Sequence, residues 1–149
     1  MVVLCMRGIK SLINRLRADF PGLVFERGDG FWFCPPGTVY YCEGFLGLPM
    51  DKIALLTLHE VAHGLLKHKD YADDVQLLKM EREAWERARG LCLEYGVEWD
   101  EEFMEERLDS YRGWLHERSL CPICQVSGYQ DVRLKYHCPV CGREREVRE

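Results

Sequence analysis

The residues with the clearest chemical potential are His59, Glu60 and His63, which form a His-Glu-x-x-His pattern. Residues four apart lie on one face of an α-helix, so His59 and His63 can present imidazole nitrogens to one metal ion. Glu60 is displaced by about 100° around the helix, where its carboxylate can reach a water on the metal without binding the metal itself. The pattern therefore predicts a zinc site with its own general base.

The segment around this pattern favours a metal site. Residues 53–66 are apolar almost all round, which is typical of a helix buried inside a domain. Two histidines and a glutamate are costly to bury in such a helix without partners. One metal ion satisfies all three groups. The alternative, two satisfied core histidines beside a salt-bridged or protonated glutamate, needs a separate partner for each group.

A second helix, expected over about 74–95, supplies candidates for a third ligand. Its apolar stripe continues through Glu81, whereas Glu83 lies about 200° away on the polar side. Two histidines and one glutamate form a known catalytic zinc shell, so we predict Glu81 as the third ligand, with Glu83 as the alternative. His68 is an alternative extra ligand, but it lies five residues beyond His63, off the ligand face of the helix, so we expect a solvated or helix-C-terminal histidine instead.

The eight cysteines fall into two groups. Two Cys-Pro-x-Cys pairs are separated by thirteen residues, a spacing typical of a four-cysteine zinc site. We expect a zinc ribbon with strands over 131–137 and 143–148, stabilised largely by its metal. The predicted ligands are Cys121, Cys124, Cys138 and Cys141. Four other cysteines are expected to be buried thiols, with a Cys34–Cys42 contact as the alternative: Cys5, Cys34, Cys42 and Cys92.

The remaining pattern predicts an α+β protein. The length of 149 residues suits one domain with a core and a small appendage. Three short aromatic and β-branched runs, separated by Gly and Pro turns, predict a three-stranded antiparallel meander. The expected strands are 23–25, 31–34 and 39–42. The other expected helices are 6–20, a metal-binding helix from an N-cap at Asp51 to about Lys67–Lys69, and 99–118.

The distribution of charge limits the class of partner. Residues 1–117 carry 14 Lys and Arg against 21 Asp and Glu, and residues 118–149 carry six against four. This balance argues against a broad nucleic-acid surface on the larger part, and gives weak support to nucleic-acid binding by the ribbon. The ribbon's alternative role is a stability staple or docking module. The basic residues to test are Arg133, Lys135, Arg143, Arg145 and Arg148.

The sequence also predicts the compartment. No apolar run reaches membrane-spanning length, and the apolar start before Arg7 is too short for a secretory signal. We therefore expect a cytoplasmic chain with no membrane partner.

The first site predicts peptide hydrolysis. Three protein ligands leave zinc an open position for water, whose pKa falls towards about 7, and the zinc polarises a carbonyl oxygen. Glu60 would take the proton of that water and pass it to the leaving amine. A further donor should stabilise the oxyanion, and the sequence leaves five candidates: Tyr40, Tyr41, Tyr71, Tyr95 and His68.

The site resembles that of the ImmA/IrrE family of small intracellular zinc metallopeptidases. The residues that carry this resemblance are His59 to Leu66, followed by Glu81-Arg82-Glu83-Ala84 and Ala88. The resemblance covers roughly residues 20–95. It implies a minimal zincin fold, with a small sheet over the active-site helix and a glutamate ligand on the next helix. It also implies a protein substrate such as a helix-turn-helix repressor, since characterised members cleave such repressors. We accordingly assign 1–118 to a zincin-like metallopeptidase domain and 119–149 to the ribbon, with one catalytic and one structural Zn²⁺.

Two features depart from this family. Trp85 stands where the family usually has an acidic or amide residue, so a hydrogen-bond partner for a ligating histidine is either missing or supplied from elsewhere. The family's Leu-Leu-Met-Pro stretch is replaced by residues 91–95. The ribbon itself is similar to that of SprT-like proteases, which act on DNA-associated proteins, but these use a later histidine as third ligand. A non-enzymatic zinc-ribbon protein that binds protein or nucleic acid is the remaining alternative.

Overall fold

The computed structural model describes residues 8–45 and 47–147, and within these ranges it contains four helices and two small sheets. The predicted α+β class is therefore confirmed. The part of the predicted first helix before Gly8 lies outside the described residues, as do Cys5 and Arg148. The elements are α1 (Gly8–Asp19), β1 (Val24–Arg27), β2 (Trp32–Cys34), β3 (Thr38–Tyr41), α2 (Met50–Leu65), α3 (Asp74–Tyr95), α4 (Glu101–Ser119), β4 (Tyr129–Gln130), β5 (Lys135–His137) and β6 (Glu144–Glu146).

The chain divides into two compact units. The first comprises Met1–Lys69 and Glu83–Asp100, and the second comprises Asp70–Arg82 and Glu101–Glu149. The dividing point falls inside α3, whose helix continues without a break from one unit into the other. The domain boundary predicted between residues 118 and 119 stays a prediction.

The sheet of the first unit differs from the predicted meander. Its strand order is β1-β3-β2, with β1 parallel to β3 and β2 antiparallel to β3. The prediction assumed that consecutive strands pair. Instead, the four-residue link after Arg27 carries the chain past β3, so that β2 pairs on its far side. Gly28 begins this link and donates its N–H to the Tyr41 carbonyl at 2.8 Å, which keeps the end of β1 attached to β3.

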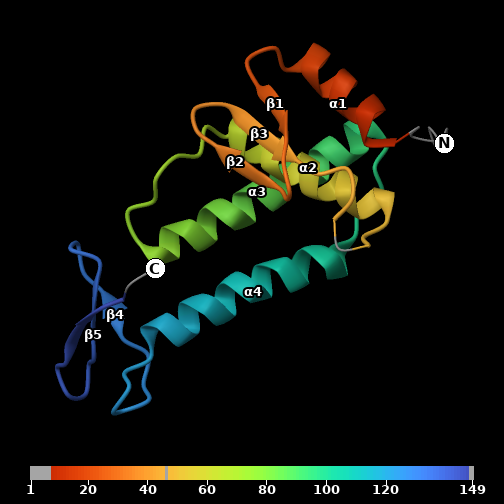
Figure 1. Ribbon diagram of the computed structural model, residues 1–149. Helices are drawn as coiled ribbons and strands as arrows, with labels where there is room; N and C mark the ends of the chain where they lie inside the picture. The colour runs from red at the N-terminus through yellow and green to blue at the C-terminus, as the bar shows by residue number, and fades with distance from the viewer. Residues whose placement is uncertain (1–7, 46, 148–149) are drawn as a thin grey trace. The chain divides into compact units, whose positions relative to one another are not determined.

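Helix α2 forms the centre of the first unit. Every residue from Ile53 to Gly64 is buried, as the apolar run predicts. The helix packs against β2, β3 and α1, and α1 also contacts β1 (Figure 1). From α1 this core takes Ile9, Leu12, Ile13 and Leu16, and from α3 it takes Ala84, Ala88, Leu91, Cys92 and Tyr95. The two predicted ligands on α2 therefore lie in a packed region rather than on the surface.

The two ends of α2 differ from the prediction. Pro49 is the N-cap and makes no side-chain cap, so Asp51 lies in the first turn, where its charge suits the helix dipole. The helix ends at Leu65 in a Schellman motif, with Lys67 in the left-handed conformation at φ 55°. The backbone N–H of His68 then donates to the His63 carbonyl at 3.0 Å. The chain therefore turns back over the last turn of the helix instead of continuing it.

Helix α3 has the predicted bounds, and α4 begins and ends within two residues of its prediction. On α3 the periodicity places Glu81 on the buried face, with 6% of its surface exposed, and Glu83 on the exposed face. Within the described part of the chain, no helix has the length and apolarity required to cross a membrane.

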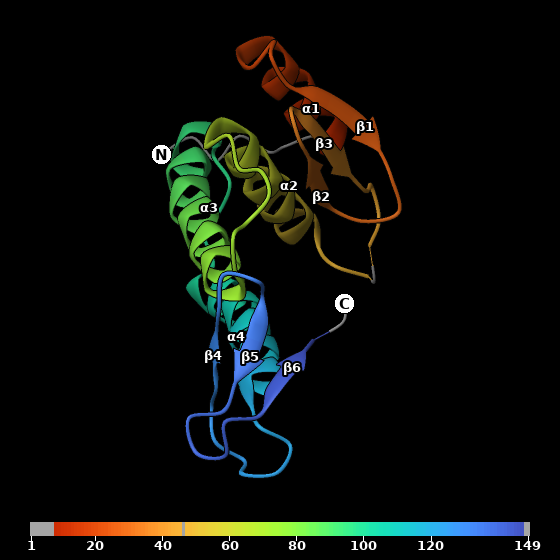
Figure 2. The same cartoon turned by 90° about the vertical axis from the view of Figure 1, so that its left-hand side faces the viewer.

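The second unit joins the C-terminal sheet to the start of α3. The sheet has the order β4-β5-β6 with antiparallel pairing (Figure 2). Gln130 of β4 accepts the backbone N–H of Asp74 at 2.9 Å, and so caps the first turn of α3. The buried Asp74 carboxylate accepts hydrogen bonds from Arg118 Nε at 3.0 Å and from the Tyr136 hydroxyl at 2.7 Å. The Asp74 carboxylate thus connects α3 to both α4 and the ribbon through hydrogen bonds.

We expect Asp74→Ala to destabilise this unit by about 3–5 kcal/mol, because it leaves the Arg118 guanidinium and the Tyr136 hydroxyl without their buried acceptor. Chemical unfolding followed by circular dichroism measures the effect. The matched control is Asp109→Ala, which removes an exposed carboxylate from α4 and should change stability by no more than about 0.5 kcal/mol. Equal stabilities of the two variants would contradict the anchoring role of Asp74.

Candidate metal centres

The structure brings together His59, His63 and Glu81. Each offers one ligand atom, these atoms all lie within 4.8 Å of one another, and all three residues are buried. The two histidines come from successive turns of α2. Glu81 comes from α3, two residues before the part of that helix that belongs to the first unit. This is the group that periodicity predicts.

The donor set and its spacing fit a zinc ion. The Nε2 atoms of His59 and His63 lie 3.2 Å apart. Two imidazole nitrogens bound tetrahedrally to zinc, with bonds of about 2.0–2.1 Å, lie about 3.3 Å apart. A buried carboxylate beside two imidazoles also gains a compensating cation when the metal binds. These residues can therefore hold zinc, with both histidines binding through Nε2.

Glu83 has a different position from Glu81. Its Oε2 lies 3.3 Å from Nε2 of His68, and about half of its side chain is exposed. Glu83 is not one of the three grouped ligands. The structure therefore favours Glu81 over Glu83 as the third donor, in agreement with the stripe on α3.

Glu60 lies on α2 between the two histidines in the chain and is buried, with 9% of its surface exposed. The geometry of the helix keeps Glu60 off the face that carries both histidines.

Aromatic rings hold the two histidines from the sides, and the sequence analysis did not anticipate this. Trp85 stacks on His59 with ring centroids 4.0 Å apart and an angle of 21° between planes. Phe33 of β2 lies parallel to His63 at 6.4 Å. The signal for Trp85 was present, because it follows Glu81 by four residues on the same face of α3.

We expect Trp85→Ala to destabilise the protein by about 3–5 kcal/mol, because it removes a side chain that is only 2% exposed and leaves a cavity beside His59. Trp85→Phe retains a ring against the imidazole and should have a clearly smaller effect. Urea unfolding of the metal-free chains measures both. An unchanged unfolding midpoint in Trp85→Ala would contradict this packing role.

The second group consists of the four predicted cysteines of the ribbon. Cys121, Cys124, Cys138 and Cys141 each offer a sulfur, and these atoms lie within 4.8 Å of one another. Sγ of Cys121 and Sγ of Cys141, one from each knuckle, are 3.7 Å apart. Two thiolates bound tetrahedrally to zinc at about 2.3 Å lie about 3.8 Å apart. The cluster therefore has the dimensions of a structural zinc site.

The local backbone favours the thiolate form of one cysteine in each knuckle. The N–H groups of Cys124 and Ile123 point at Cys121 and lower the pKa of its thiol to about 6. The N–H groups of Cys141 and Val140 lower the pKa of Cys138 in the same way. Hydrogen bonds that stabilise the thiolate favour the form that binds metal.

The prediction of buried thiols holds for only one of the described residues outside this cluster. Cys92 is buried, and burial raises the pKa of its thiol to about 12. Cys34 is exposed and Cys42 is partly exposed, so the prediction is wrong for these two. Cys34 is the last residue of β2, and Cys42 follows the last residue of β3. In the sheet Cys34 pairs with Thr38 rather than Cys42.

The chain gives no match in comparisons with family models, curated proteins and solved structures.

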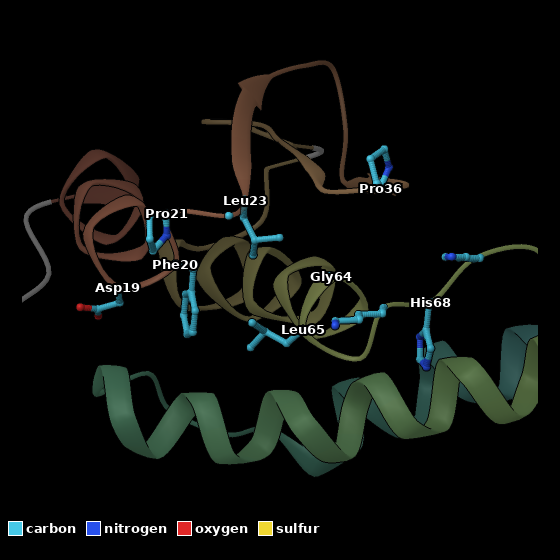
Figure 3. A pocket seen from close by; sticks show the side chains of 11 residues that line it. Asp19, Phe20, Pro21, Leu23, Pro36, Gly64, Leu65 and His68 are labelled. Atoms are coloured by element: carbon cyan, nitrogen blue, oxygen red, sulfur yellow. The ribbon is translucent and has the colours of Figure 1, made fainter.

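A pocket of about 490 Å³ lies beside the end of α2 (Figure 3). Figure 3 shows Phe20, Leu23 and Leu65 around it and His68 at one end. Gly64 is part of its wall and allows a close approach, because a Cβ atom there would lie 2.9 Å from Leu23 Cδ2. The lining of this pocket includes none of the three residues of the first metal group.

The candidate oxyanion donors occupy different environments. The Tyr95 hydroxyl donates to Asp19 at 2.5 Å, Tyr41 is buried, and Tyr40 stacks on Trp32. Tyr71 is exposed. His68 lies just beyond the C-terminal end of α2, as one of the two expectations has it, but it is not solvated, because only 10% of its side chain is exposed and its ring contacts His63.

Proposed function

We propose that the chain is a zinc-dependent endopeptidase of the cytoplasm, with a catalytic zinc at His59, His63 and Glu81 and a structural zinc at the four ribbon cysteines. The single observation that carries the proposal is the convergence of the two Nε2 atoms, 3.2 Å apart, with a buried glutamate from another helix. A purely structural site would have no use for the buried Glu60 on the same helix. A reducing compartment would keep the zinc-binding thiols from pairing.

In this proposal each residue has one role. Zinc supplies Lewis acidity when bound, by lowering the pKa of a water ligand and polarising the substrate carbonyl. His59, His63 and Glu81 would hold the metal as its three protein ligands. Glu60 accepts the proton of the attacking water and then delivers it to the nitrogen of the leaving amine. Trp85 fixes the ring of His59 by stacking.

The proposed substrate is a regulatory protein such as a helix-turn-helix repressor. This part rests on the resemblance of residues 20–95 to the ImmA/IrrE family. The SprT-like alternative has less support, because it requires a later histidine as ligand. Of the later histidines, His137 hydrogen-bonds Asp131 at 2.8 Å and His116 is exposed. Recognition of nucleic acid by the ribbon stays an alternative role for that sheet.

Incubation of the zinc-loaded chain with a peptide library derived from a bacterial proteome tests the proposal. We expect new peptide termini, detected by mass spectrometry, that disappear after treatment with a chelator and return when zinc is added. The absence of new termini from the zinc-loaded chain across the whole library would contradict peptidase activity.

A further inference from the structure

His68 is held against His63 by both backbone and side chain. The Schellman motif at the end of α2 places the His68 N–H on the His63 carbonyl at 3.0 Å. In addition, Nδ1 of His68 lies 2.8 Å from Nδ1 of His63. The side chain of His68 is 10% exposed, so this contact is largely shielded from water. The turn therefore presents a specific ring nitrogen to a specific ring nitrogen.

The direction of these hydrogen bonds follows from the metal group. His63 faces His59 with Nε2, so Nε2 is the atom available to a metal and Nδ1 carries the proton. His63 Nδ1–H then donates to Nδ1 of His68. With Nδ1 accepting, the proton of neutral His68 is on Nε2, from which it donates to Glu83 Oε2 at 3.3 Å. Every atom in the chain from His63 to Glu83 has a compatible role.

We propose that His68 is a positioning residue that orients His63 for zinc, with Glu83 fixing the tautomer of His68 in turn. The inference rests on the proposed function, because it assumes a metal at His59, His63 and Glu81. Metal-bound histidines generally donate their second N–H to an acceptor, which fixes the ring and raises its basicity. Here the acceptor is a second histidine, His68, in place of the usual carboxylate or carbonyl. The Glu83 carboxylate accepts a hydrogen bond from His68 in turn.

The same geometry separates the roles of the two glutamates on α3. Glu81 is buried in the ligand group, whereas Glu83 is about half exposed and lies on His68. Solvent screens the interaction with Glu83, so its contribution to His63 should be smaller than that of His68. Removal of the His68 side chain should therefore weaken zinc binding more than removal of the Glu83 side chain.

Zinc affinity of the full-length chain, measured by competition with a chromophoric chelator, tests the inference. We expect His68→Ala to weaken zinc binding at the first site by about 10–100-fold. His68→Asn should recover most of the affinity, because its side-chain oxygen can accept where Nδ1 did. Glu83→Ala should weaken binding by less than about tenfold. The exposed His116 of α4 provides the matched control, and His116→Ala should bind zinc like the parent.

Two further measurements make the outcome specific. Cobalt substitution distinguishes metal bound at the ribbon from metal bound at the first site, because only the ribbon cysteines give thiolate-to-metal charge-transfer absorption. Thermal unfolding of the metal-free chains detects damage to the fold. Unchanged affinity in His68→Ala, or an Asn variant as weak as the Ala variant, would overturn the role of His68 while leaving the peptidase proposal intact. If His59→Ala binds as much zinc as the parent, both proposals are overturned.

Discussion

Glu60→Gln is expected to lower the rate of peptide cleavage by about 10²–10⁴-fold, the usual contribution of a general base. The amide has the shape of the carboxylate and fits the same buried position, but it cannot accept the proton of the attacking water. Steady-state kinetics on any peptide found to be cleaved measures the effect. Zinc content and unfolding temperature should remain those of the parent, because Glu60 is not in the ligand group.

The control for this variant is Glu117→Gln, which neutralises an exposed glutamate on α4 and should retain full activity. Parent-like cleavage by Glu60→Gln would contradict the role of Glu60 as a base. Loss of one zinc from Glu60→Gln would instead make Glu60 a ligand and revise the composition of the site.

Cys121→Ser is expected to remove the ribbon zinc and unfold the sheet from β4 to β6. The sheet has few buried side chains of its own, and structural zinc contributes about 10–16 kcal/mol to the folding of small domains at pH 7. The Cys121 thiol, with its pKa lowered to about 6, ionises easily, whereas a serine hydroxyl does not. Hydrogen exchange monitored by mass spectrometry should show loss of protection in residues 120–147.

The matched control is Cys34→Ser, which changes an exposed thiol at the end of β2 and should leave zinc content and exchange unchanged. A Cys121→Ser chain with full zinc content and a protected sheet would show that the cysteine cluster does not stabilise the ribbon.

The helices and the metal groups could be predicted because they depend on local pattern. The apolar run of residues 53–66 predicts a buried α2, and the stripe of α3 places Glu81 inward and Glu83 outward. Each Cys-Pro-x-Cys pair predicts a metal-binding knuckle, since its two cysteines lie within four consecutive residues. In these cases the spacing along the chain sets the distance in space.

The strand order and the position of His68 could not be predicted in this way. The link between β1 and β2 is short enough for a hairpin, and nothing in its composition indicates that it passes β3. A helix that continued past Leu65 would carry His68 off the ligand face, but Lys67 adopts a positive φ, which residues other than Gly and Asn seldom do. The turn at Lys67, rather than helical periodicity, brings His68 to His63.

Zinc stoichiometry by elemental analysis of the purified chain and of His59→Ala tests the central claim most directly. The account predicts two zinc ions per parent chain and one in His59→Ala, with the remaining zinc held by the ribbon cysteines. One zinc in both proteins, with no other metal in the parent, would contradict a metal site at His59, His63 and Glu81.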